Sequence, residues 1–106
     1  MSRESLGHFE LLVLLALLRQ GEEAYGVPIA HAIEHSTGKP VILASVYNTL
    51  ERLEEKGLVR STMGRPTAAR GGRAKRYFAM TAEGLREVRA AKKALTVLWR
   101  GIPVEG

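Results

Sequence analysis

Two short stretches of alternating side chains flank a basic, glycine-rich segment, and this pattern limits what the chain can fold into. The stretches are residues 58–63 and 75–81, and residues 64–74 between them are rich in Gly, Arg and small side chains. Alternation is typical of an extended strand, in which successive side chains point to opposite faces. Two such strands joined by a loop can pair as a hairpin. The sequence therefore predicts a β-hairpin with a strongly basic loop.

Helical patterns precede the hairpin. Residues 6–20 are strong helix formers that stop at Gly21, so they predict a first helix. Its apolar side chains extend almost all the way round, and a domain of 106 residues can hardly cover such a helix alone. The first helix thus favours a partner subunit.

A second helix is predicted from near Gly26, with Pro28 tolerated in its first turn, and it ends before Gly38.

Residues 43–56 predict a third, amphipathic helix. Its apolar residues recur at spacings of four and three: Val46, Leu50 and Leu53. Thr81 can cap a final helix that runs to about Arg100, because a threonine hydroxyl accepts a hydrogen bond from the exposed amides of a first turn. The predicted fold class is mainly α with a small β-hairpin.

The charges favour a polyanionic partner. The formal net charge is +5, and every charged residue from Lys56 to Ala82 is Lys or Arg. A cluster of this kind attracts nucleic acid. All acidic residues are Glu and there is no Cys, which excludes a catalytic Asp, a thiol nucleophile and a thiolate metal site. We therefore expect a protein that is not an enzyme and that needs no cofactor or metal.

The sequence shows no targeting signal. The longest apolar run, residues 11–18, is too short to cross a bilayer, and no basic leader with a cleavage site precedes it. We expect a cytoplasmic protein with no membrane association.

The order helix, helix, turn, amphipathic helix, basic hairpin and helix is the layout of a winged helix-turn-helix. A helix fits the major groove of B-DNA, where its polar side chains reach base edges. Basic residues of a hairpin can neutralise phosphates or enter a minor groove. We predict that residues 43–56 enter the major groove of double-stranded DNA. Residues 64–76, called the wing below, are predicted to contact the DNA backbone or a minor groove.

Three segments also match the pattern of a known family. The segment SVYNTLERLEEKGLV supplies Tyr47, Leu50, Arg52, Leu53 and Gly57. The segment GGRAKRYFAMTAEG supplies Gly72, Arg73, Tyr77, Thr81 and Gly84, and Tyr25-Gly26 opens the second helix. In these residues the chain resembles the PadR family over roughly residues 9–88. The resemblance implies a transcriptional regulator, usually a repressor, that dimerises through its terminal helix. Such a homodimer would read a near-palindromic operator.

The resemblance places residues 1–82 in a DNA-binding unit and residues 83–106 in a dimerisation helix, within one compact unit. The candidate DNA contacts of the third helix are Ser45, Tyr47, Asn48, Thr49 and Arg52. Those of the wing are Arg65, Arg70, Arg73, Lys75 and Arg76. Two alternatives stay open, because Tyr47 could be a half-buried packing residue and Arg52 could pair with Glu55.

The chain departs from the family at a few positions. Ile42 and Leu43 stand where the family often has a capping Ser and a Pro, and Asn48 and Ala74 stand where it often has Pro. Asn48 can hydrogen-bond a base edge, which a proline cannot do. We therefore expect an operator that differs from those of relatives.

Apolar residues of the last helix lie near heptad spacing, which suits a dimer seam better than a helix buried in one subunit. Together with two residues of the first helix they form the predicted dimerisation set: Leu12, Leu15, Leu85, Val88, Leu95, Leu98, Trp99 and Ile102. Some PadR relatives bind planar apolar effectors beside aromatic residues at the dimer interface. Trp99 is therefore also a candidate contact for a small aromatic effector.

Two other functions fit parts of the sequence. His31, Glu34 and His35 match the H-x-x-E-H pattern of zinc hydrolases, in which the two His bind the metal and the Glu acts as base. Such an enzyme also needs a third ligand and a cleft. A winged helix can instead bind protein, and that binding would not weaken steeply with salt. The basic wing favours DNA over a protein partner.

Overall fold

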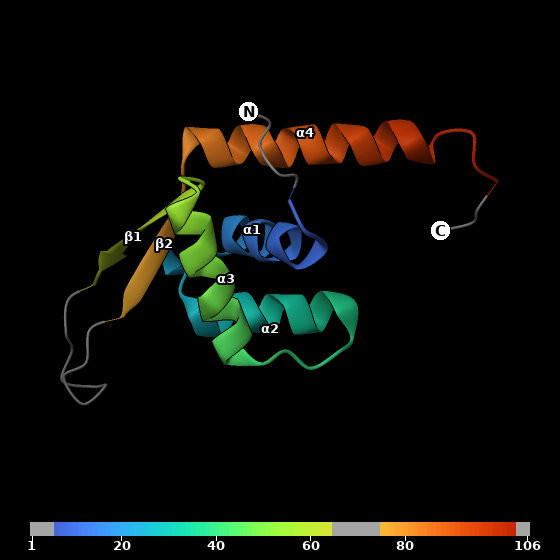
Figure 1. The fold of residues 1–106 in the computed structure, drawn as a ribbon. Helices are drawn as coiled ribbons and strands as arrows, with labels where there is room; N and C mark the ends of the chain where they lie inside the picture. The colour runs from blue at the N-terminus through green and yellow to red at the C-terminus, as the bar shows by residue number, and fades with distance from the viewer. Residues whose placement is uncertain (1–5, 65–74, 104–106) are drawn as a thin grey trace.

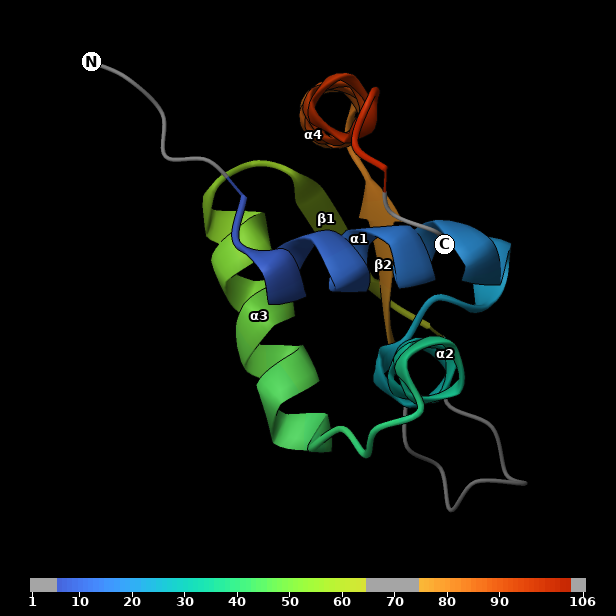
Figure 2. The same cartoon turned by 90° about the vertical axis from the view of Figure 1, so that its right-hand side faces the viewer.

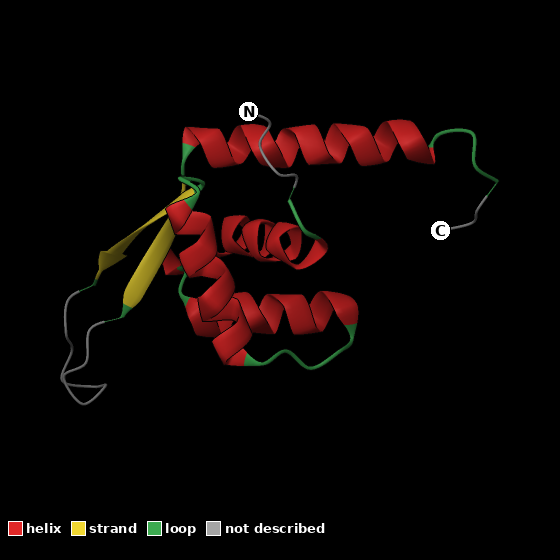
Figure 3. Cartoon of the chain, in the orientation of Figure 1, coloured by secondary structure: helices red, strands yellow, loops and turns green. Residues whose placement is uncertain are grey.

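The computed structural model describes residues 6–64 and 75–103. The elements follow in the order α1 (His8–Gln20), the short 3₁₀ helix η1 (Gly21–Glu23), α2 (Gly26–Thr37), α3 (Leu43–Glu55), β1 (Val59–Met63), β2 (Arg76–Met80) and α4 (Ala82–Trp99) (Figure 1). The predicted fold class, mainly α with a small β-hairpin, is confirmed (Figure 3). Within those two ranges, no helix has both the length and the apolar character needed to cross a membrane.

Helix α1 lies at the centre of the molecule, which explains why its apolar residues nearly encircle it. Helices α4 and α2 lie on opposite sides of it, and α3 and β2 also contact it (Figures 1 and 2). The buried core joins residues from all these elements: Val13, Leu14, Leu17, Ile29, Ile33, Val46, Leu50, Leu53, Leu58, Phe78 and Val88. A single chain thus covers most of α1, contrary to the expectation from sequence. Leu15 and Leu18 nevertheless remain 43% exposed.

The hairpin is fixed to the helical core on one face. Strands β1 and β2 are antiparallel, with Val59 opposite Met80 and Met63 opposite Arg76. Phe78 is buried, and its amide donates a hydrogen bond to the Ala24 carbonyl at 2.8 Å, just before α2. The base of the hairpin is therefore held against the helices, and the two strands run from there towards the wing (Figure 1).

A buried carboxylate links the start of α1 to the end of α3. Glu10 is 8% exposed and accepts hydrogen bonds from the Gly7 amide at 2.8 Å and from Lys56 Nζ at 2.9 Å. Burial alone would raise the pKa of Glu10, but the hydrogen bonds from Lys56 and Gly7 and the nearby positive charges lower it below its ordinary value. This ion pair fixes where α3 ends relative to α1.

The turn between α2 and α3 is closed by local bonds. Gly38 adopts a left-handed conformation (φ 72°) that ends α2, which is the conformation glycine tolerates best. Glu34 then accepts a hydrogen bond from the Val41 amide at 2.8 Å. These contacts set the angle at which α3 leaves α2, and so they position the second helix of the helix-turn-helix.

Helix α4 begins in the core and ends on the surface. The Thr81 hydroxyl accepts a hydrogen bond from the Gly84 amide at 3.0 Å, as predicted for a cap. Val88, predicted to lie in a dimer seam, is only 7% exposed within one chain, which corrects that prediction: it packs in the core of its own subunit. Beyond Ala91 every described residue of α4 is exposed.

Candidate nucleic-acid interface

The two halves of α3 differ in charge. Val46, Leu50 and Leu53 are fully buried on one side of the helix, as the spacing predicts. The first half has no charged residue, and Ser45 and Asn48 are exposed there. The second half carries Glu51, Glu54 and Glu55. Because phosphates repel carboxylates, the first half is the part of α3 suited to approach DNA.

The helix starts where the sequence predicts, although it has no polar cap. Ile42 is the N-cap residue and its side chain makes no capping hydrogen bond. The start of α3 and the ends of β1 and β2 nearest the wing lie on the side of the molecule away from α4 (Figure 1). This side therefore presents the first half of α3 and the hairpin together, and α4 does not obstruct it.

Tyr47 packs between helices. Its side chain is half-buried against the core, and a Cβ atom on Gly26 would overlap the end of its ring. Gly26 is thus needed where Tyr47 crosses the start of α2. The alternative of a half-buried packing residue fits this geometry, and the ring is largely occupied by that contact.

Thr49 and Arg52 form a local pair on α3. Thr49 is only 2% exposed, so the expectation that its side chain contacts DNA is corrected: the side chain faces the core, and its hydroxyl accepts a hydrogen bond from Arg52 Nη2 at 3.2 Å. Arg52 itself is exposed, and its bond goes to Thr49, whereas Glu55 was the partner considered from sequence.

Arg76 is held by carboxylates of α3. Its Nη2 donates to Glu54 Oε1 at 2.7 Å, and its Nη1 lies 3.8 Å from Glu51 Oε1. The other oxygen of Glu54 accepts hydrogen bonds from the Ser61 hydroxyl at 2.9 Å and from the Ser61 amide at 3.1 Å. Glu54 therefore joins both strands to α3. The hydrogen bond from the Ser61 hydroxyl lowers the pKa of Glu54. Burial opposes this effect, and the Ser61 amide and Arg76 lower the pKa further.

Sequence reasoning missed the role of Glu54. The residues that it joins are 7 and 22 positions away along the chain, so no local spacing indicates them. Arg76 was predicted as a DNA contact because it lies in a basic segment. In the structure its charge is already paired, which makes it a residue that positions the hairpin.

Lys75 directly precedes Arg76, the first residue of β2. Its ammonium stands 3.7 Å from the centre of the Tyr25 ring, and Tyr25 meets Tyr77 edge to face with ring centres 5.5 Å apart. A cation over an aromatic face keeps its full positive charge while its stem is held in place. Lys75 thus remains a candidate phosphate contact. The other predicted wing residues, Arg65, Arg70 and Arg73, lie outside the described residues.

Comparison with known proteins identifies the family. The sequence model of the transcriptional regulator PadR-like family matches residues 14–90, which include the whole helix-turn-helix and the hairpin. The chain belongs to this family. No curated protein matches the sequence significantly.

Solved structures of PadR-like regulators share the fold. The PadR family regulator of Eggerthella lenta DSM 2243 is 29% identical, with a TM-score of 0.67 over 86% of this chain and 77% of that one. A complex structure of hsRosR is 27% identical, with a TM-score of 0.68 over 91% of this chain and 76% of that one. A PadR family regulator of Clostridium difficile R20291 has a TM-score of 0.71 over 87% of this chain and 91% of that one. Its sequence is 24% identical, so this match supports only a similar fold.

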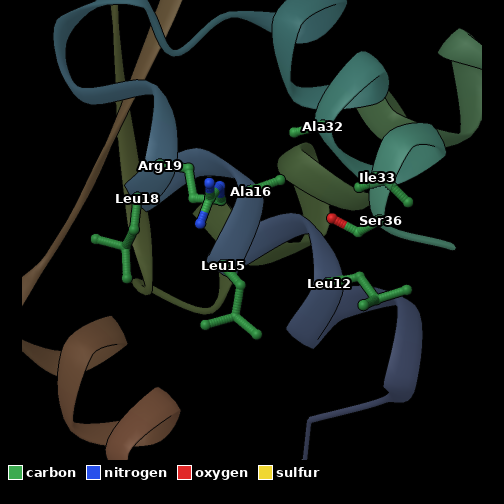
Figure 4. Close-up of a pocket in the computed structure, with 8 residues that line it drawn as sticks. All are labelled: Leu12, Leu15, Ala16, Leu18, Arg19, Ala32, Ile33 and Ser36. Carbon is green, nitrogen blue, oxygen red and sulfur yellow. The ribbon is translucent and has the colours of Figure 1, made fainter.

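This PadR-like chain exposes an apolar stripe at the end of α4 and in the residues just after it. Leu95, Leu98, Trp99 and Ile102 are between 47% and 71% exposed. Of the other predicted dimerisation residues, Leu12 and Leu85 are half-buried. Leu12, Leu15 and Leu18 of α1 also line a groove of about 470 Å³, whose other wall is formed by Ala32, Ile33 and Ser36 of α2 (Figure 4).

The zinc pattern on α2 does not gather a ligand set. His31 and His35 are exposed, and Glu34 is engaged by the Val41 amide in the turn before α3. Across residues 6–64 and 75–103, no three His or Glu side chains are placed to hold a metal ion. The family is one of transcriptional regulators, and Glu34 has a structural explanation that does not involve catalysis.

Proposed function

We propose that this chain is a sequence-specific DNA-binding regulator that acts as a homodimer, with the first half of α3 in the major groove and the wing on the backbone or in a minor groove. The observation that carries this proposal is the pairing of an acid-free first half of α3 with the hairpin on one side of a PadR-like fold. In this arrangement Ser45 and Asn48 read base edges, and Arg52 and Lys75 neutralise phosphates.

The proposal includes the finer assignments that the family implies. Residues 1–82 form the DNA-binding unit and residues 83–106 serve dimerisation. The regulator is a repressor of a near-palindromic operator, and it acts in the cytoplasm. Two half-sites then lie about one helical turn apart.

Selection of bound fragments from a random duplex library, at physiological salt, tests this function. We expect a symmetric site to be enriched, and its affinity to fall steeply as salt is added because bound counterions are released from the DNA. Failure to enrich any sequence, together with absence of binding at low salt, would refute DNA recognition. Salt-insensitive capture of a protein partner would then favour the protein-interaction module.

A pair of charge-matched variants locates the interface. Arg52→Ala removes the cation of the second half of α3, one turn after Asn48, whereas Arg89→Ala removes one from the exposed surface of α4. We expect Arg52→Ala to weaken operator binding severalfold and Arg89→Ala to leave it unchanged. Equal losses in the two variants would show that only net charge matters and would contradict the placement on α3.

Dimerisation is proposed because α4 continues its buried side as an exposed apolar stripe. At 100° per residue, Leu95 and Trp99 lie on the same side of the helix as Gly84 and Val88, which are buried. A second copy can cover this stripe with its own α4 and with the groove between α1 and α2.

Two neighbouring residues of α4 provide a matched test of the dimer. Leu98 is 71% exposed in the stripe, and Val97 is 53% exposed on another side of the helix. Sedimentation analysis of the wild type should give a dimer. We expect Leu98→Glu to dissociate it and Val97→Glu to retain it. A monomeric wild type at micromolar concentration would rule out the proposed dimer.

The exposed side chain of Trp99 is the basis for proposing that an aromatic effector binds there. Trp99 is the only tryptophan of the chain, and it is 58% exposed within the stripe. A planar aromatic compound bound there at the dimer interface would quench or shift its fluorescence. A broad panel of aromatic compounds that leaves the emission unchanged would remove this part of the proposal.

A further inference from the structure

The start of α3 carries an exposed apolar side chain where helices prefer a polar one. Ile42 is the N-cap residue, makes no side-chain hydrogen bond and is 72% exposed. N-cap positions favour Ser, Thr, Asp or Asn, because their side chains accept hydrogen bonds from the free amides of the first turn. Neither burial nor capping therefore explains an isoleucine at this position.

The surroundings of Ile42 are those of the proposed DNA contact. The Ser45 amide donates to the Ile42 carbonyl at 2.9 Å, so Ile42 lies one turn before Ser45. Leu43 is 40% exposed beside it. No acidic residue occurs between Glu34 and Glu51, and the amides at the start of α3 give this end a partial positive charge. A polyanion can thus approach Ile42 closely.

We infer that Ile42 contacts the C5-methyl group of a thymine in the major groove. The inference rests on the proposed DNA binding. Recognition helices reach base edges with their N-terminal residues, and thymine is the base that presents a methyl group in the major groove. An apolar side chain in that groove is stabilised where it covers this methyl and removes both groups from water. Each half-site therefore contains a T·A pair opposite the start of α3.

Uracil provides the direct test, because it keeps every hydrogen bond of thymine and lacks only the methyl. Operator duplexes are made with uracil at one thymine position in both half-sites, position by position. For the wild type, removal of the one methyl that Ile42 covers lowers affinity by about fourfold per half-site, or about sixteenfold for a dimer. We expect this decrease at one symmetric position.

Variants of Ile42 assign the methyl recognition to this side chain. Ile42→Ala should bind the thymine and uracil operators equally, whereas Ile42→Val, which keeps a branched apolar side chain, should still prefer thymine. Because Ile42 is largely exposed, both variants should unfold at the same urea concentration as the wild type.

Three results would overturn the inference while leaving the proposed function intact: a selected operator without a conserved T·A pair, a wild type indifferent to uracil at every position, or an Ile42→Ala variant that keeps the full preference for thymine. A chain that binds no DNA would overturn both the function and the inference.

Discussion

Replacement of Arg76 distinguishes a residue that positions the hairpin from one that contacts phosphate. In Arg76→Met the apolar stem is kept, and the bond to Glu54 at 2.7 Å is removed. A charge-assisted hydrogen bond contributes about 1.5–3 kcal/mol, but the side chains of Arg76 and Glu54 are about one-third exposed, at 35% and 33%. Solvent screening reduces the expected decrease in unfolding free energy to about 1–2 kcal/mol.

Two assays separate the effects of this variant. In urea unfolding, at one fixed protein concentration because the protein is proposed to dimerise, the midpoint should fall by about 0.5–1 M. In operator binding, the slope of log K against log salt should stay near that of the wild type, because Arg76 is already neutralised by Glu54. Lys75→Met, the matched variant, should flatten this slope by about 0.9 for each phosphate that the protein no longer neutralises.

The reasoning would be refuted if Arg76→Met flattened the salt slope as much as Lys75→Met and left the urea midpoint unchanged. Glu54→Gln completes a double-mutant cycle, in which the two decreases in stability should not add because both variants break one interaction.

The pH dependence follows from the same pair. The pKa of Glu54 is lower in the folded protein than its ordinary value of 4.5. Its contribution to stability is therefore complete above that ordinary value and is lost as pH falls through the lowered pKa. Unfolding of the wild type should become easier in that acidic range, and the dependence should be weaker in Arg76→Met. An identical acid profile in the two proteins would show that Glu54 is not coupled to Arg76.

Three other substitutions test the fold around the interface by urea unfolding. Glu10→Ala removes the part-buried ion pair with Lys56 and should lower the free energy of unfolding by about 2 kcal/mol; no change would contradict the role of that pair. Gly84→Ala places a Cβ against the Leu58 carbonyl oxygen, so it should lower the free energy of unfolding by about 3 kcal/mol, even though alanine has a higher helix propensity than glycine. A gain in stability would show that the helix can shift. Thr81→Ala removes the cap of α4 and should cost about 1 kcal/mol, whereas Thr81→Ser should not.

Local patterns in the sequence were sufficient for the secondary structure. The spacing of Val46, Leu50 and Leu53 predicted α3 and its buried side, and Thr81 marked the start of α4. The acid-free segment after Lys56 predicted a basic hairpin. These features depend on residues within a turn or a strand of one another, and a single sequence contains that information.

The site was only partly predictable, because exposure depends on distant residues. Ser45 and Asn48 are exposed as expected, but Thr49 is buried. Neighbouring side chains on a helix differ in direction by 100°. The spacing of the apolar residues around position 49 does not show where the buried side of α3 ends to within one residue. Likewise, whether Val88 faces its own core or a partner depends on where α4 crosses α1.

The sequence by itself determined the order of the elements, the basic character of the hairpin and the family likeness. The tertiary structure alone decided that Arg76 is paired with Glu54, that Tyr47 rests on Gly26, and that Ile42 is exposed at the start of α3. Helix and strand patterns arise from neighbours along the chain, whereas the pairing and exposure of a charged or apolar side chain arise from elements that meet only when the chain is folded.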